Sequence, residues 1–253
     1  MRKTKIEAGL SQFKTVFQRI LEDDASQVID EAILELDSSK KEYDEKKRRT
    51  DNPKLVPKPW GYTVYPQKPL RFRTSEVIKG FPMSIDIYCV IRWEKEGEMP
   101  VNQQIHLRVW SKELDYVIRP EWDADQIIER ISSQYGRVML RCHFDLANPK
   151  QEGPKYHLQF GGEAQSDEVW WLPGIVDLPR INFPPMDLIL IGQLIAANFY
   201  KEEYERIRNE IEWIGTVRES QKIFLKDYYQ LCLTEINSDN ILLDRLWNSW
   251  QKY

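Results

Sequence analysis

The middle of the chain alternates apolar and polar side chains over several consecutive segments, and this alternation constrains the fold most. Successive side chains of a β-strand point to opposite faces, so the pattern predicts strands with one apolar and one polar face. Five segments rich in β-branched and aromatic residues follow it, at 70–74, 83–93, 104–110, 137–146 and 155–160. Most connections between them are short and have Gly or Pro in or beside them. We therefore predict an antiparallel β core over residues 70–162.

One segment inside this region has a helical pattern instead. Ile127, Ile128 and Ile131 fall on one face of a short helix over residues 123–135. Asp123 and Asp125 stand at its start, where acidic side chains stabilise the end of a helix. This explanation accounts for the two carboxylates better than a metal pair, which would need further oxygen ligands nearby.

The residues before the β core divide into a helical arm and a linker. Apolar residues at helical spacing predict two helices in residues 1–50, the N-terminal helical arm. The stretch 38–49 is almost entirely charged, so we expect it to stand in solvent. Residues 51–69 form a Pro-rich linker, because three prolines between 53 and 59 exclude helix and favour extended chain.

The residues after the β core read as an extended crossing followed by helices. Residues 163–185 are rich in Pro and Trp, and we expect them to be packed, with Trp170 and Trp171 as apolar side chains that face a partner. Residues 186–253 carry the spacing of C-terminal helices, the first starting at Pro185 and a break falling at Gly215. The expected fold class is α+β, a central antiparallel β-meander flanked by an N-terminal helical pair and a C-terminal helical bundle.

This order of elements, a helix, a meander, a proline-rich crossing and C-terminal helices, resembles that of ubiquitin-conjugating-like domains. The catalytic cysteine that such a domain carries after its meander has no counterpart here, because Cys232 lies far down a predicted helix. The resemblance therefore implies a catalytically inactive relative.

Charge and cysteine usage exclude several classes of function. A net charge of −4 argues against a nonspecific polyanion binder, although a local basic patch could still contact nucleic acid. Cys89, Cys142 and Cys232 form no CxxC and no Cys/His pair, so we predict neither a disulfide framework nor a metal or other cofactor. The most apolar run, 186–199, is too short to span a bilayer, and we expect a cytoplasmic protein without membrane contact.

Strand alternation gathers chemically active side chains on one sheet face. If the apolar rows face one core, all three histidines of the chain share the opposite face with two arginines and an aspartate. These candidate ligand- or partner-binding residues are His106, Arg108, Arg141, His143, Asp145 and His157, with Asp86 beside them. Such a face could bind an anion or support acid–base chemistry. It could equally be the solvated polar face that antiparallel sheets commonly have.

Three functions follow from these patterns. The first is a non-enzymatic binding or accessory subunit of an intracellular multiprotein complex, with a protein partner, suggested by nine tryptophans, the apolar crossing and the lack of a catalytic motif. The second is a nucleic-acid-processing or hydrolytic protein that uses the His/Arg/Asp face. The third is the inactive ubiquitin-conjugating-like domain.

Overall fold

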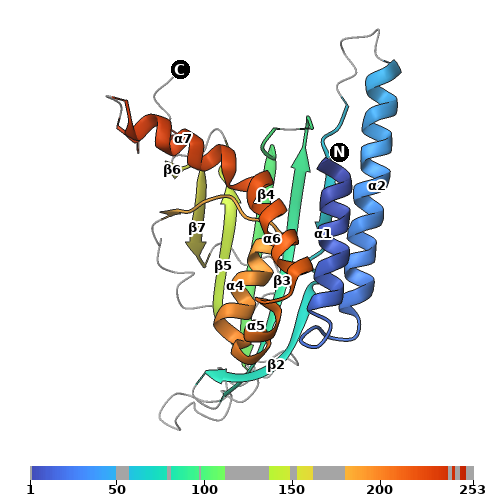
Figure 1. The fold of residues 1–253 in the computed structure, drawn as a ribbon, viewed down its shortest axis with the longest axis vertical. Helices are drawn as coiled ribbons and strands as arrows, with labels where there is room; N and C mark the ends of the chain where they lie inside the picture. The colour runs from blue at the N-terminus through green and yellow to red at the C-terminus, as the bar shows by residue number, and fades with distance from the viewer. Residues whose placement is uncertain are drawn as a thin grey trace, which may run out of the picture.

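An antiparallel sheet forms the centre of the molecule, with helices before and after it in the chain (Figure 1). The computed structural model describes residues 2–49, 57–78, 81–96, 98–111, 137–148, 153–161, 180–238, 241–242 and 246–248. Within these residues the sheet has seven strands, which pair in the order β1-β3-β4-β5-β7-β8, while β2 also pairs with β3. The strands are β1 (Trp60–Val64), β2 (Leu70–Ile78), β3 (Phe81–Trp93), β4 (Asn102–Ser111), β5 (Arg137–Leu146), β7 (Tyr156–Phe160) and β8 (Ile181–Asn182). The predicted α+β class and the antiparallel sheet are confirmed.

Six helices flank the sheet in the described part of the chain. They are α1 (Arg2–Val16), α2 (Ala25–Arg49), α4 (Leu188–Phe199), α5 (Lys201–Ile207), α6 (Ile211–Phe224) and α7 (Lys226–Ile236). Figure 1 shows α1 and α2 side by side along one edge, and α4, α5 and α6 in front of the strands. A second, two-stranded sheet pairs β6 (Gly153–Pro154) with β9 (Trp247–Asn248). No described helix combines the length and the apolar character that a membrane crossing requires.

The apolar strand side chains and the helices share one hydrophobic core. Ile85, Ile87, Ile105 and Leu107 are buried in the same cluster as apolar residues of α1, α2, α4 and α6. Phe13 of α1 is at its centre: its ring stacks on one neighbour and meets two others edge-on, namely Phe17, Phe72 and Trp213. This core fixes which face of the sheet is turned towards the helices.

Part of the predicted linker is a strand. Residues 60–64 form β1, which pairs with β3, and all five of its residues are buried. A strand buried on both faces shows no alternation, so the pattern could not reveal it. The charged stretch 38–49 is also less solvated than expected. Ser39 hydrogen-bonds the backbone of Gly61, and the ring of Tyr43 is buried.

The helix boundaries near the C-terminus differ from those the sequence predicts. The first helix begins at Leu188, not at Pro185, because the Asp187 carboxylate caps it by accepting a hydrogen bond from the Leu190 amide at 2.9 Å. Gly215 lies inside α6 and does not break it; the helical segments are instead separated at Tyr200, at 208–210 and at Leu225. A single glycine costs a helix only about 1 kcal/mol, which buried neighbours on the same helix offset.

Several predicted segments are only partly covered. The short helix at 123–135, residues 163–179 and both Trp170 and Trp171 lie outside the described residues, so these predictions stay open. The end of the crossing is described, and residues 181–182 form strand β8. Towards the end of the predicted C-terminal helices, residues 242 and 246 are helical, and Trp247–Asn248 form β9.

Two glycines in helices offer a matched test of this core. A side chain on Gly192 of α4 would collide with the ring of Phe13, which its aromatic neighbours hold in place, whereas a side chain on Gly215 would meet nothing within 4 Å. We expect Gly192→Ala to lower the free energy of unfolding by about 1–3 kcal/mol through overpacking. Gly215→Ala should raise it by roughly 0.5–1 kcal/mol through helix propensity alone. Urea denaturation of both variants measures the difference, and equal effects would contradict the close approach of α1 and α4.

Candidate metal centre on the polar sheet face

Strand register brings the predicted candidate residues onto one face of the sheet. Residues directly opposite each other on antiparallel strands point to the same side. The register pairs Asp86 with Arg108, His106 with His143, Arg108 with Arg141, and Asp145 with His157. The β4–β5 register shifts only between Val109 and Trp110, beyond these pairs. We call these side chains the polar sheet face: Asp86, His106, Arg108, Arg141, His143, Asp145 and His157.

This face is buried and is not the solvated surface that antiparallel sheets commonly show. Arg108 is 7% exposed and His157 2%, and Asp86, Arg141 and His143 are buried as well. Alternation assigns a side chain to a face but carries no information about what covers that face, so the sequence could not indicate burial. Buried charged and polar groups are costly unless they are paired. The pairing of each group therefore decides what the face can do.

The β3–β4 half of the face is a satisfied ion pair. The Arg108 guanidinium donates from Nε to Asp86 Oδ1 at 2.6 Å and from Nη2 to Oδ2 at 2.9 Å. The Trp110 indole donates to the same Oδ2 at 3.0 Å. Burial raises the pKa of Asp86, and the Arg108 hydrogen bonds and charge oppose that rise. This half therefore serves structure.

The aromatic side chains of the face form a continuous row across four strands. The His157 and His143 ring centroids are 6.3 Å apart, those of His143 and His106 5.3 Å, and Tyr88 stacks on His106 at 4.4 Å. Burial lowers the pKa of His106 to about 3 and that of His157 to about 4, and it lowers the pKa of His143. All three imidazoles are consequently neutral at pH 7, so each ring has one nitrogen that donates a proton and one that carries a lone pair.

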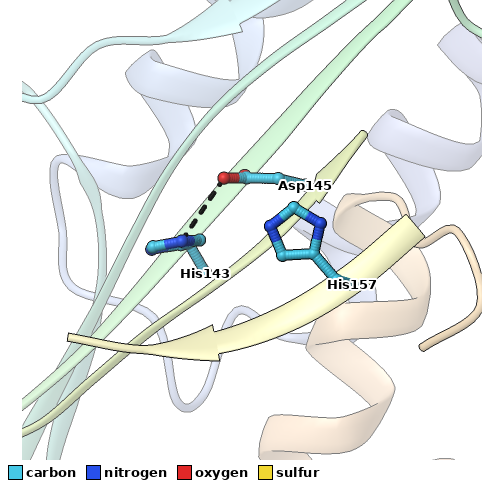
Figure 2. Close-up of side chains that lie close together, drawn as sticks. All are labelled: His143, Asp145 and His157. Carbon is cyan, nitrogen blue, oxygen red and sulfur yellow. Dashed lines mark ion pairs between the residues drawn. The ribbon is translucent and has the colours of Figure 1, made fainter. Parts of the chain in front are cut away.

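Three ligating side chains converge at the β5–β7 end of the row (Figure 2). His143 Nε2 lies 3.5 Å from Asp145 Oδ2, and one ligand atom from each of His143, Asp145 and His157 lies within 4.8 Å of the others. We call these three residues the His/Asp/His triad. Nitrogen and oxygen ligands at about 2.0–2.2 Å from one ion in tetrahedral geometry are about 3.4 Å apart. The His143–Asp145 separation matches that value, and His143 Nε2 would exchange its contact with Gln159 Oε1, at 3.2 Å, for an ion.

The second nitrogen of His157 is already engaged in the way metal-bound histidines require. His157 Nδ1 lies 3.1 Å from the carbonyl oxygen of Pro154, to which it donates when the proton is on Nδ1. This hydrogen bond places the lone pair on Nε2, and ligating histidines usually hold their other N–H in such a contact. The Pro154 carbonyl thus fixes both the tautomer and the orientation of the ring.

The triad also contains buried polar atoms that its neighbours leave unsatisfied. Among the described residues Asp145 Oδ1 and His143 Nδ1 have no partner at normal hydrogen-bond geometry, although the Ile105 backbone lies against the Asp145 carboxyl and the Gly161 backbone against the His143 ring. Burial raises the pKa of Asp145 to about 7, against the nearby positive charge of Arg180. A buried acceptor without a partner is rare in folded proteins, and one explanation is an ion. The donor set therefore fits a divalent cation.

The chemistry of these donors narrows the choice of ion. Two imidazoles and one carboxylate suit zinc, iron, cobalt or nickel better than magnesium or calcium, which prefer all-oxygen sites. Cys142 of β5 pairs with Leu107 on the opposite, apolar face, so it contributes no thiolate. Three protein ligands would leave at least one coordination position for water or an anion.

Sequence reasoning grouped these residues but did not indicate metal binding. His143 and Asp145 are two residues apart, and their partner His157 comes from the next strand, so no short-range spacing marks the set. Gln159 was missed as a participant. Its Oε1 lies 3.2 Å from His143 Nε2 and accepts a hydrogen bond from Arg180 Nε at 3.3 Å. Alternation does place Gln159 on the same face as His157, although it was not among the candidate residues, whereas nothing in the sequence places Arg180 here.

Comparisons with known proteins add no assignment. No family model, no curated protein and no solved structure matches the chain. The resemblance to ubiquitin-conjugating-like domains therefore stays a prediction from element order. Function has to be inferred from the geometry of the polar sheet face and from the exposed surfaces.

The buried Asp86–Arg108 pair generates a stability prediction. Arg108→Met leaves the Asp86 carboxylate buried without its countercharge, and we expect a loss of about 3–5 kcal/mol in the free energy of unfolding. The double variant Asp86→Leu/Arg108→Met removes both charges and should recover most of that loss. Urea denaturation of the wild type, both single variants and the double variant gives the coupling. Additive effects would show that the two charges act independently.

Proposed function

We propose that this chain binds one divalent transition-metal ion through His143, Asp145 and His157. The observation that carries the proposal is the convergence of three ligand atoms within 4.8 Å at a largely buried position. The hydrogen bond that His157 Nδ1 donates to the Pro154 carbonyl supports it, because it leaves the lone pair of that ring on Nε2, where a metal ion can bind. The unpartnered Asp145 Oδ1 supports it as well, since a cation would satisfy that atom.

The number of ligands favours a reactive centre over a purely structural one. Structural zinc sites usually have four protein ligands, whereas catalytic sites have three and bind water or substrate in the remaining position. A bound metal of this class lowers the pKa of its water and generates a nucleophile near neutral pH. The triad therefore supports the hydrolytic alternative drawn from the sequence. It supports nucleic-acid processing less, because Arg108, which would have to bind a phosphate, already donates two hydrogen bonds to Asp86.

Metal titration with matched histidine variants tests this proposal. The full chain, freed of metal with a chelator, should bind one equivalent of Co²⁺ with visible d–d absorption and should be stabilised by Zn²⁺ in thermal melts. Asp145→Asn and His157→Ala should weaken binding by more than the roughly 10–100-fold that loss of an outer-shell partner costs. His106→Ala is the control, because His106 lies 5.3 Å from His143 in the same row but outside the triad.

The result depends on the contrast between these variants. If Asp145→Asn and His106→Ala weaken Co²⁺ binding equally, the triad does not form the site. If the wild-type chain binds no Co²⁺ and no Zn²⁺, the three residues form a buried polar cluster without a metal function. Circular dichroism confirms that each variant is folded before titration.

A second function, the accessory subunit expected from the sequence, is supported by helix α7. Tyr229, Leu233 and Ile236 follow the i, i+4, i+7 spacing of one helix face, and Leu233 and Ile236 are 60% and 63% exposed. Figure 1 shows α7 leading away from α6. An exposed apolar row at this spacing is what a helix presents to a partner helix. We propose that this row, the α7 row, binds an amphipathic helix of a partner protein.

Charge substitutions on the same helix test the α7 row. Leu233→Glu/Ile236→Glu places two charges in the row, and we expect it to release bound partners without lowering the melting temperature. Gln230→Glu/Thr234→Glu adds two negative charges at exposed positions outside the row, and this variant should still bind the partners. Affinity capture from a lysate of the native host, compared between the two variants by mass spectrometry, makes the measurement. Identical sets of captured proteins would contradict a role for the row.

A further inference from the structure

A second site is independent of the polar sheet face and lies between helices α1 and α6. Here the structure forms a cavity of about 340 Å³ that is partly open to solvent, with a volume within the range of small-ligand sites. Tyr62 of β1 and Asp187, the cap of α4, contribute to its lining from the sheet and from the third helix. Four separate elements, α1, β1, α4 and α6, contribute to its lining, with Asp187 and Ser220 at its buried end and Lys5 and Glu212 at its open end.

Two helices carry glycine where they line this cavity. A side chain on Gly215 of α6 would meet nothing within 4 Å, and one on Gly9 of α1 would make an ordinary contact of 3.7 Å with Ile189. Gly192 of α4 is different, since close approach to Phe13 requires glycine there. Each glycine inside a helix costs roughly 0.5–1 kcal/mol relative to alanine. Gly9 and Gly215 thus bear that cost although a side chain at either position would meet no steric clash.

Polar groups line the buried part of this cavity. Ser220 is 4% exposed, and its hydroxyl lies beside the Asp187 carboxyl without a hydrogen bond of normal geometry. Asp187 is buried, and burial raises its pKa to about 6. The Ser220 hydroxyl is therefore a buried group with unused hydrogen-bonding capacity next to a carboxylate.

Charge and apolar surface around the cavity indicate the kind of ligand. Three carboxylates line it against a single ammonium, that of Lys5, which Glu219 already pairs at 2.6 Å. The carboxylates are Asp187, Glu212 and Glu219. The apolar side chains are Ile6, Leu10, Ile189 and Ile223. An acidic excess beside aliphatic side chains complements a molecule with one cationic and one apolar end.

We propose that this cavity binds a small aliphatic amine. Its ammonium group donates hydrogen bonds to the Asp187 carboxylate and to the Ser220 hydroxyl, and its alkyl chain lies against Ile6, Ile189 and Ile223. Such a bond satisfies the Ser220 oxygen and supplies a countercharge to Asp187. This site needs neither a metal ion nor the His/Asp/His triad.

Three ligands with the same six-carbon chain separate the contribution of charge to the binding affinity from that of the apolar contacts. Hexylamine, hexanol and hexanoate are titrated into the ¹⁵N-labelled full chain, and the amide resonances of Gly9 and Gly215 report on the cavity. We expect saturable shifts of both amides with hexylamine, and binding at least about tenfold tighter than that of hexanoate, because a charged hydrogen bond contributes about 1.5–3 kcal/mol. Ser220→Ala should reduce this preference.

Filling the cavity provides the matched control. Gly215→Leu occupies open space, so it should fold and abolish the hexylamine shifts at Gly9. Arg218→Leu makes the same kind of change at an exposed position of α6 that does not line the cavity, and it should bind as the wild type does. Absence of saturable shifts, equal affinity for the three probes, or undiminished binding by Gly215→Leu would each overturn the proposal. Repeating the titration with Asp145→Asn keeps the result separate from the fate of the metal site.

Discussion

The antiparallel register of β3, β4, β5 and β7 determines the environment of nearly every side chain discussed above. On the helix side it pairs Ile105 with Phe144 and Leu107 with Cys142, and these rows are buried against α1, α4 and α6. A slip of one residue would exchange the two faces and move Arg108 into that aliphatic core. The hydrophobic core therefore holds the polar sheet face in place, although the polar groups contribute little to that core themselves.

The two halves of the polar sheet face differ in how well their groups are satisfied. Asp86 is bound by both Arg108 and Trp110, so its burial is compensated. Asp145 keeps an oxygen without a partner among the described residues, and its neighbours His143 and His157 are neutral at pH 7. A network that served stability alone would be satisfied throughout. His106 Nδ1 of β4 also has no partner among the described residues, so what distinguishes the β5–β7 end is the convergence of three ligand atoms there.

Sequence alternation was sufficient to predict the sheet and the membership of the polar face, as the cross-strand pairs His106–His143 and Asp145–His157 show. Local patterns gave the wrong structure where a strand is buried on both faces and where packing outweighs helix propensity. β1 is buried throughout, so it shows no alternation, and Gly215 continues a helix that local propensity alone would end. Burial of the polar face and the approach of Arg180 to Gln159 depend on segments distant in sequence, which no local pattern encodes. The glycines of the α1–α6 cavity illustrate the same limit, because a glycine that a close approach requires and one that leaves open space look identical in the sequence.

The orientation of His157 depends on the C-terminal end of the described chain. Pro154, whose carbonyl lies 3.1 Å from His157 Nδ1, pairs with Trp247 in the β6–β9 sheet, and the Lys155 amide donates to the Leu246 carbonyl at 2.8 Å. Pro154 and Trp247 are therefore more than ninety positions apart in sequence. A displacement of β9 would reach the triad through the carbonyl group of Pro154. Because binding energies are reciprocal, an ion that selects this orientation of His157 must also stabilise the docking of β9 on β6. The proposed metal site and the attachment of the C-terminal segment would then be thermodynamically coupled, although they share no side chain.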